Sequence, residues 1–200
     1  MTRTLTDFEQ VVFADFEFVA RPGEHPDVVC LAWHEASSGQ TYRLWRDHLG
    51  SKPPYRIDDK TLFVCFVGNA ELSCHLALGW ALPANILDLN PEFRCIVNGR
   101  TVPAGKGLLG ALAYYGLDSI GSKRKDDLRS RIMKGWPFNN KEREEILLYC
   151  TSDAARRRTI SSGSAHSPGA GRANDVEEYA PQLPGGASRS CSGIVSPVTL

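Results

Sequence analysis

Two carboxylates stand two residues apart near the start of the chain. Asp15 and Glu17 lie within an otherwise apolar run that extends from Val11 to Val19. Because side chains alternate between the two faces of a strand, Asp15 and Glu17 would project from the same face. Two like charges on a buried strand resist desolvation unless a cation lies between them. This spacing therefore predicts a site for a hard divalent cation bound by oxygen ligands.

Two further positions carry carboxylates in segments with a helical pattern. Tyr149 and Asp153 are four residues apart, so on a helix they would lie on one face, one turn apart. Glu71 opens the helical pattern at 69–78, directly after an apolar run. Each has an alternative interpretation. Glu71 could be a first-turn acid that suits the helix dipole, and Tyr149 with Asp153 could be an ordinary amphipathic pair.

The segments around these residues predict an α/β fold. Strands are expected at 11–19, 27–34, 41–45, 62–67 and 86–89, and helices at 69–78, 107–115 and from 139 onward. The first three strands, joined by short turns, form an antiparallel meander, and the next two form a strand–helix–strand unit. Asn139 and Glu142 are spaced as in a capping box, which marks the start of the last helix. The prediction is a mixed central sheet flanked by helices.

The composition changes at residue 154. We expect one domain at 8–154 and a low-complexity, disordered tail at 155–200, because the last 47 residues are rich in Ser, Gly and Pro and contain no Phe, Trp or Met. Such a sequence buries too little apolar surface to offset chain entropy. The expectation for the last helix is therefore fraying beyond Asp153, with that carboxylate loosely held.

The overall composition excludes several classes of protein. The formal net charge is zero, so any nucleic-acid binding must come from local patches rather than from a basic surface field. No segment is long and apolar enough to span a membrane, and no signal peptide is evident, which predicts a soluble, cytoplasmic protein. The six cysteines form no CxxC pair and the histidines have no zinc-like spacing, so we expect reduced, structural cysteines.

The order and placement of these motifs resemble the proofreading 3′–5′ exonuclease domain of family-A DNA polymerases, in the Tyr-containing branch of the DEDD superfamily. The resemblance covers residues 8–154 and implies an RNase H-like fold. The family's first motif, Asp-x-Glu, is matched by Asp15 and Glu17, and its third, Tyr-x-x-x-Asp, by Tyr149 and Asp153. The middle motif departs from the usual Asn-x-x-x-Asp pattern, because Asn69 precedes Glu71 by only two residues.

The resemblance also implies an activity. In such domains two Mg²⁺ or Mn²⁺ ions drive phosphodiester hydrolysis, and here the tyrosine of the third motif would orient the attacking water. Nucleotides would be removed from DNA 3′ ends, as in polymerase proofreading, by a truncated fragment of a DNA polymerase. The alternative is an inactive nucleic-acid-binding remnant of such a domain, and a preference for DNA or RNA stays open. The metal ligands implied are Asp15, Glu17, Glu71 and Asp153.

The implied partners are single-stranded DNA or a DNA 3′ end, and a polymerase, but no membrane. Candidate residues for contact with the nucleic acid are Asn69, Lys123, Arg124 and Trp136, the last by stacking on a base. The alternative for the basic segment is a solvated helix of mixed charge, because Asp126 and Asp127 interrupt it.

Overall fold

The computed structural model describes residues 5–117 and 122–164 of the chain. Most of the expected tail, 165–200, therefore lies outside the described residues. In the described part of the chain no helix is both long and apolar enough to cross a membrane. The five cysteines in that part are free thiols, as expected: Cys30, Cys65, Cys74, Cys95 and Cys150.

A five-stranded mixed sheet organises the described residues, with the strand order β3-β2-β1-β4-β5. The central strand β1 pairs antiparallel with β2 and parallel with β4, while β3 is antiparallel to β2 and β5 is parallel to β4. This is the meander joined to a strand–helix–strand unit that the sequence predicts, and the α/β fold class with a mixed central sheet is confirmed. The strands are β1 (Gln10–Val19), β2 (Asp27–Glu35), β3 (Thr41–Trp45), β4 (Thr61–Cys65) and β5 (Asn85–Asp88).

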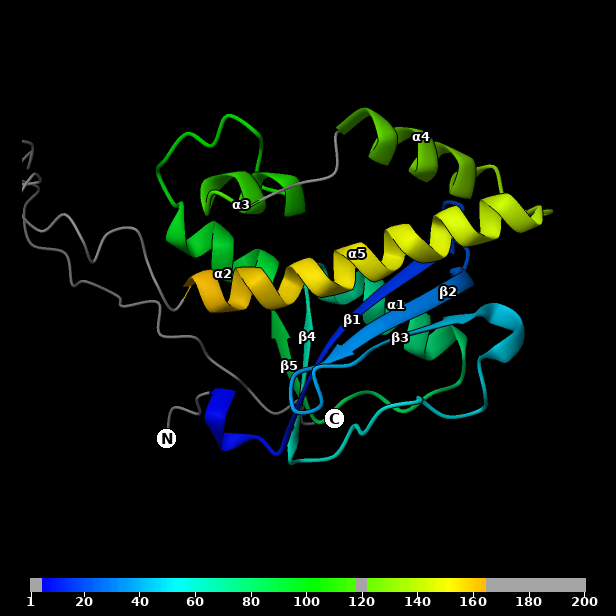
Figure 1. Ribbon diagram of the computed structural model, residues 1–200, viewed down its shortest axis with the longest axis horizontal. Helices are drawn as coiled ribbons and strands as arrows, with labels where there is room; N and C mark the ends of the chain where they lie inside the picture. The colour runs from blue at the N-terminus through cyan, green and yellow to red at the C-terminus, as the bar shows by residue number, and fades with distance from the viewer. Residues whose placement is uncertain (1–4, 118–121, 165–200) are drawn as a thin grey trace, which may run out of the picture.

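Helices cover both faces of the sheet (Figure 1). Helix α1 (Gly68–Ala77) packs on one face, and the long helix α5 (Asn140–Ser164) crosses β1, β2 and β3 on the other. The remaining helices are α2 (Leu89–Ile96), α3 (Leu108–Tyr114) and α4 (Ser122–Met133), with short 3-10 turns η1 (Leu5–Asp7) and η2 (Arg46–His48). Helix α2 was not anticipated from the sequence.

The alternation along β1 separates its carboxylates from the hydrophobic cluster on the α1 side of the sheet. Ala14 and Phe16 are buried with Cys74 and Trp80 on the α1 side of the sheet. Phe13 is buried with residues of α2, α3 and α5 on the opposite side. Asp15 lies on the same side as Phe13, as the period of two requires. The chemistry-bearing face of β1 is therefore the face that α5 covers.

Helix α5 begins as predicted but continues beyond the expected end of the domain. The backbone N–H of Asn139 donates to Glu142 Oε2 at 2.8 Å, and the N–H of Glu142 donates to Asn139 Oδ1 at 3.0 Å, which completes the capping box. The expected boundary at residue 154 falls inside this helix, and the expected fraying is wrong. Ala154, Arg157 and Ile160 recur at helical spacing and are buried, so the packed stripe extends a further two turns.

Candidate active site

Residues that are far apart in the sequence line one cavity at the carboxyl ends of the parallel strands β1 and β4. Its volume is about 490 Å³, within the range of ligand-sized pockets. Strand β1, the first turn of α1, the middle of α5 and helix α4 supply its polar lining. The structure thus brings together all five predicted catalytic residues: Asp15, Glu17, Glu71, Tyr149 and Asp153.

Two backbone features place Glu71 at this cavity. Helix α1 starts immediately after β4, and the N–H of its first residue, Gly68, donates to Asp88 Oδ2 at 2.7 Å. A Cβ at Gly68 would lie 2.9 Å from that oxygen, so the approach is close. Asp88 also caps α2 by accepting from the N–H of Asn90 at 3.0 Å. These bonds make Asp88 a capping residue for both helices and hold Glu71 in the first turn of α1.

Contacts between α5 and β1 place Tyr149 and Asp153. The Cys150 thiol donates to the carbonyl oxygen of Asp15 at 3.2 Å, and Cys150 itself is fully buried. Tyr149 and Asp153 are also buried, one turn apart on the face toward β1. Arg156 lies beside Asp153, with 3.3 Å between its Nη1 and Asp153 Oδ1. The carboxylate is therefore held within a packed helix rather than at a frayed end.

The sequence analysis did not find Arg157, one helical turn beyond Asp153. Its guanidinium is buried and bonds to Asp15 Oδ1 and to the carbonyl oxygen of Ala14. Its Nη1 also lies 2.7 Å from Glu71 Oε1. The i, i+4, i+8 spacing of Tyr149, Asp153 and Arg157 was the signal that could have identified it.

Burial dominates the electrostatics of this site. It raises the pKa of Asp15, opposed by the Arg157 guanidinium and reinforced by the charges of Asp153 and Glu71. Burial likewise raises the pKa of Glu71, again opposed by Arg157. The pKa of Tyr149 is raised by burial, by nearby carboxylates and by a hydrogen bond to Asp153, so its hydroxyl keeps its proton at neutral pH. Tyr149 is thus a hydrogen-bond donor in this site and not a base.

The predicted metal ligands share a cavity but do not form a ready metal cluster. Among the described residues, no group of three or more His, Cys, Asp or Glu side chains is arranged to hold a metal ion. The donor chemistry nevertheless fits a hard cation, because carboxylate oxygens are its preferred ligands. Asp15 Oδ2 and Glu71 Oε2 are buried without a hydrogen-bond partner, which is the state of an oxygen that a cation could still bind. Their other oxygens already contact Arg157.

The predicted nucleic-acid contacts are more scattered. Asn69 is exposed in the first turn of α1, near the cavity, whereas the side chains of Lys123 and Arg124 lie outside the described residues. Trp136 donates through Nε1 to Asp27 Oδ2 at 2.8 Å and packs edge-on against Trp45. These contacts give Trp136 a structural role, and its stacking on a base stays a prediction.

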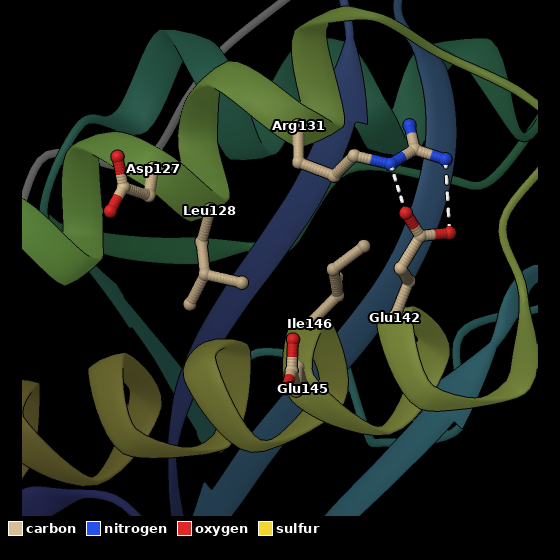
Figure 2. Close-up of a pocket in the computed structure, with 6 residues that line it drawn as sticks. All are labelled: Asp127, Leu128, Arg131, Glu142, Glu145 and Ile146. Atoms are coloured by element: carbon tan, nitrogen blue, oxygen red, sulfur yellow. Dashed lines mark hydrogen bonds and ion pairs between the residues drawn. The ribbon is translucent and has the colours of Figure 1, made fainter.

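Helix α4 forms a second wall of the cavity and is itself fixed to α5. Arg129 and Met133 line the cavity from α4. On the neighbouring side of α4, Arg131 donates to Glu142 through both Nε and Nη2, and the Nη2–Glu142 Oε2 distance is 3.1 Å (Figure 2). Arg131, one of the basic residues of this segment, is therefore committed to an ion pair within the protein, whereas Arg129 is exposed at the cavity.

Comparisons with known proteins add little to this description. No protein-family model matches the sequence, and a search of curated proteins finds no match. Among solved structures, the chain is similar to the EXO domain of Nibbler from Aedes aegypti, with 14% sequence identity and a TM-score of 0.40, over 78% of this chain and 79% of that chain.

Proposed function

We propose that this chain is a metal-dependent nuclease that removes nucleotides from DNA 3′ ends, as the exonuclease domains of family-A DNA polymerases do. One observation carries the proposal. Four carboxylates and one tyrosine, supplied by β1, α1 and α5, line a single cavity at the ends of the parallel strands. Three of these carboxylates, Asp15, Glu71 and Asp153, are buried, and a buried carboxylate cluster lowers stability even when it is partly paired. That cost supports a role in chemistry.

The metal-binding part of the proposal concerns the carboxylates of β1 and α5, whose oxygens are the ligands a hard cation prefers. Asp15 and Glu17 from β1, with Asp153 from α5, would hold a divalent ion. When bound, such an ion lowers the pKa of water and stabilises charge on a phosphate oxygen. The protein residues bind and orient the substrate around it.

The remaining residues of the cavity have roles that follow from their positions. The protonated Tyr149 hydroxyl donates a hydrogen bond and would orient the attacking water. Arg129, exposed at the rim, would contact a phosphate of the incoming strand. An apolar wall would exclude water from the terminal nucleotide; it is formed by Phe18, Phe66, Leu108, Leu109 and Met133.

A second candidate function is nucleic-acid binding without hydrolysis. The specific observation in its favour is the buried Arg157, which already neutralises part of the carboxylate cluster. A guanidinium in the cavity can bind a phosphate, since the two match in charge and geometry. This candidate predicts binding of single-stranded DNA that does not depend on a divalent ion.

A nuclease assay separates the two candidates. The full chain is incubated with a 5′-labelled single-stranded oligonucleotide and Mg²⁺ or Mn²⁺, and the products are resolved by length. We expect a ladder of progressively shortened labelled products that EDTA abolishes, which marks removal from the 3′ end. The isosteric variant Asp153→Asn should lower the rate about 100-fold or more, because it removes a charge from the metal site. The matched control Glu24→Gln removes a carboxylate from an exposed turn and should cleave at the wild-type rate.

Three outcomes would count against the proposal. Wild-type protein that binds the oligonucleotide but leaves it intact with either metal would favour the binding function. Release of labelled mononucleotide at the start of the reaction would show that nucleotides are removed from the 5′ end, which is opposite to the proposed polarity. Equal rates for Asp153→Asn and wild type, with both proteins shown to be folded by circular dichroism, would mean that Asp153 takes no part in hydrolysis.

A further inference from the structure

Arg157 occupies the position between two of the four carboxylates. Its side chain is 5% exposed, and it contacts Asp15 from β1 and Glu71 from α1 at the same time. A third bond, to the carbonyl oxygen of Ala14, fixes the guanidinium against the backbone of β1. Helix α5, which carries Tyr149 and Asp153, thus also places the Arg157 guanidinium among these carboxylates.

The charge on Arg157 is permanent under all ordinary conditions. Burial alone lowers the pKa of the guanidinium, but Asp15 and Glu71 outweigh that effect and leave the pKa raised. A buried guanidinium costs several kcal/mol unless it is paired, and pairing with two carboxylates is what offsets the cost here. Its removal would leave two adjacent buried carboxylates with no cation between them. Those carboxylates would then have to take up a proton or bind a metal ion.

We propose that Arg157 is an internal cation that closes the Asp15–Glu71 half of the cavity to a divalent metal ion. This inference rests on the proposed function, since it concerns the same carboxylate cluster. Two ions per chain would require one of them between Asp15 and Glu71, where a guanidinium and a divalent ion compete for Asp15 Oδ1 and Glu71 Oε1. The wild-type protein therefore binds fewer divalent ions than its four carboxylates could hold.

The experiment measures Mn²⁺ stoichiometry instead of activity. Full-length wild type and Arg157→Gln are titrated with Mn²⁺, and free ion is followed by electron paramagnetic resonance. We expect the variant to bind one more Mn²⁺ ion per chain than the wild type does. Arg158→Gln is the matched control: it removes the same charge from the adjacent residue, whose guanidinium contacts His34 and not the cavity. Its binding curve should superimpose on that of the wild type.

Folding is followed in the same samples by thermal melting with EDTA and with Mn²⁺. In EDTA the variant should melt at a lower temperature than wild type, and Mn²⁺ should raise its melting temperature by more than it raises that of wild type, because an ion that binds only the folded state stabilises it. If Arg157→Gln fails to fold in both buffers, the number of Mn²⁺ ions bound per wild-type chain tests the inference. Two tightly bound Mn²⁺ ions per wild-type chain would overturn the inference, and fewer would support it.

The inference and the proposed function fail in different ways. Identical Mn²⁺ binding curves for wild type and a folded Arg157→Gln variant would overturn the role of Arg157 even if the protein is an active nuclease. An extra Mn²⁺ ion in the variant, together with no cleavage by either protein, would uphold the role of Arg157 and contradict the nuclease proposal.

Discussion

At the scale of single residues, the cavity contains charged side chains and one neutral hydrogen-bond donor, and these have different roles. Asp15 and Glu71 are buried beside the Arg157 guanidinium, whereas Tyr149 is a neutral donor within the same cavity. Removal of Asp15 would leave Arg157 with one carboxylate fewer, so stability and activity change together in such a variant. The tyrosine offers a cleaner substitution, because its hydroxyl can be removed while its ring stays.

Tyr149→Phe should lower the nuclease rate at saturating oligonucleotide about 10–100-fold, the effect of one lost hydrogen bond in a dry site, with little change in KM. Because the raised pKa keeps the Tyr149 hydroxyl protonated, the wild-type rate should show no loss from its ionisation up to about pH 10, the usual tyrosine pKa. The control is Tyr114→Phe on α3, whose hydroxyl accepts from Arg100 Nη1 at 2.9 Å. Equal rates for Tyr149→Phe and wild type would remove the tyrosine from the chemistry.

At the scale of the elements, α5 matters most to the site. It supplies Tyr149, Asp153 and Arg157, and it packs on three strands of the sheet. Its last turns are part of the core, since Ile160 is 2% exposed and belongs to the cluster that contains Phe13. The end of α5 therefore helps to hold the helix face with Tyr149 and Asp153 against β1.

Ile160→Ala should lower the free energy of unfolding by about 3 kcal/mol, because it leaves a cavity in a packed core. Leu148→Ala is the control in the same helix: this side chain is 50% exposed, and its truncation should change the free energy by no more than about 0.5 kcal/mol. Urea denaturation measures both values. An equally small effect for Ile160→Ala would mean that α5 contributes no packing beyond Asp153, which is what the Ser-, Gly- and Pro-rich composition after residue 154 predicts.

At the scale of the whole molecule, a buried histidine makes stability depend on pH. His75 of α1 donates through Nδ1 to the carbonyl oxygen of Ala81 at 3.0 Å and accepts at Nε2 from the Tyr55 hydroxyl at 2.8 Å. Burial lowers its pKa, although the bond to Ala81 acts in the opposite direction. The unfolded chain, with a histidine pKa near ~6.5, takes up a proton before the folded chain does. Stability from this group is complete above that pH and is lost as the pH falls below it.

Between pH 7.5 and 5.5, the wild-type free energy of unfolding should fall by about 1 kcal/mol more than that of His75→Gln. The comparison between variants is needed because the raised pKa of Asp15 acts with the opposite sign over part of this range. His25→Gln, at an exposed histidine, should follow the wild type. Parallel pH profiles for wild type and His75→Gln would show that His75 is protonated as readily in the folded chain as in the unfolded one.

Local patterns in the sequence were sufficient for the five strands, for helices α1 and α3 and for the start of α5, but not for α2. The period of two placed Asp15 and Glu17 on one face of β1, and the period of the helix placed Tyr149 above Asp153. The Asn139–Glu142 capping box and the structural cysteines follow from local chemistry in the same way. These features depend on neighbours in the chain, which a sequence displays directly.

Only the tertiary structure decided what surrounds the carboxylates. Arg157 lies in an Arg-rich stretch next to a low-complexity segment; its helical spacing places it on the face of Tyr149 and Asp153, but does not indicate which carboxylates it pairs with. Its partners Asp15 and Glu71 are 142 and 86 positions away in the chain, so their pairing depends on how α5 crosses the sheet. The sequence by itself determined which residues could do chemistry. Long-range packing determined that the Arg157 guanidinium lies beside two of the carboxylates.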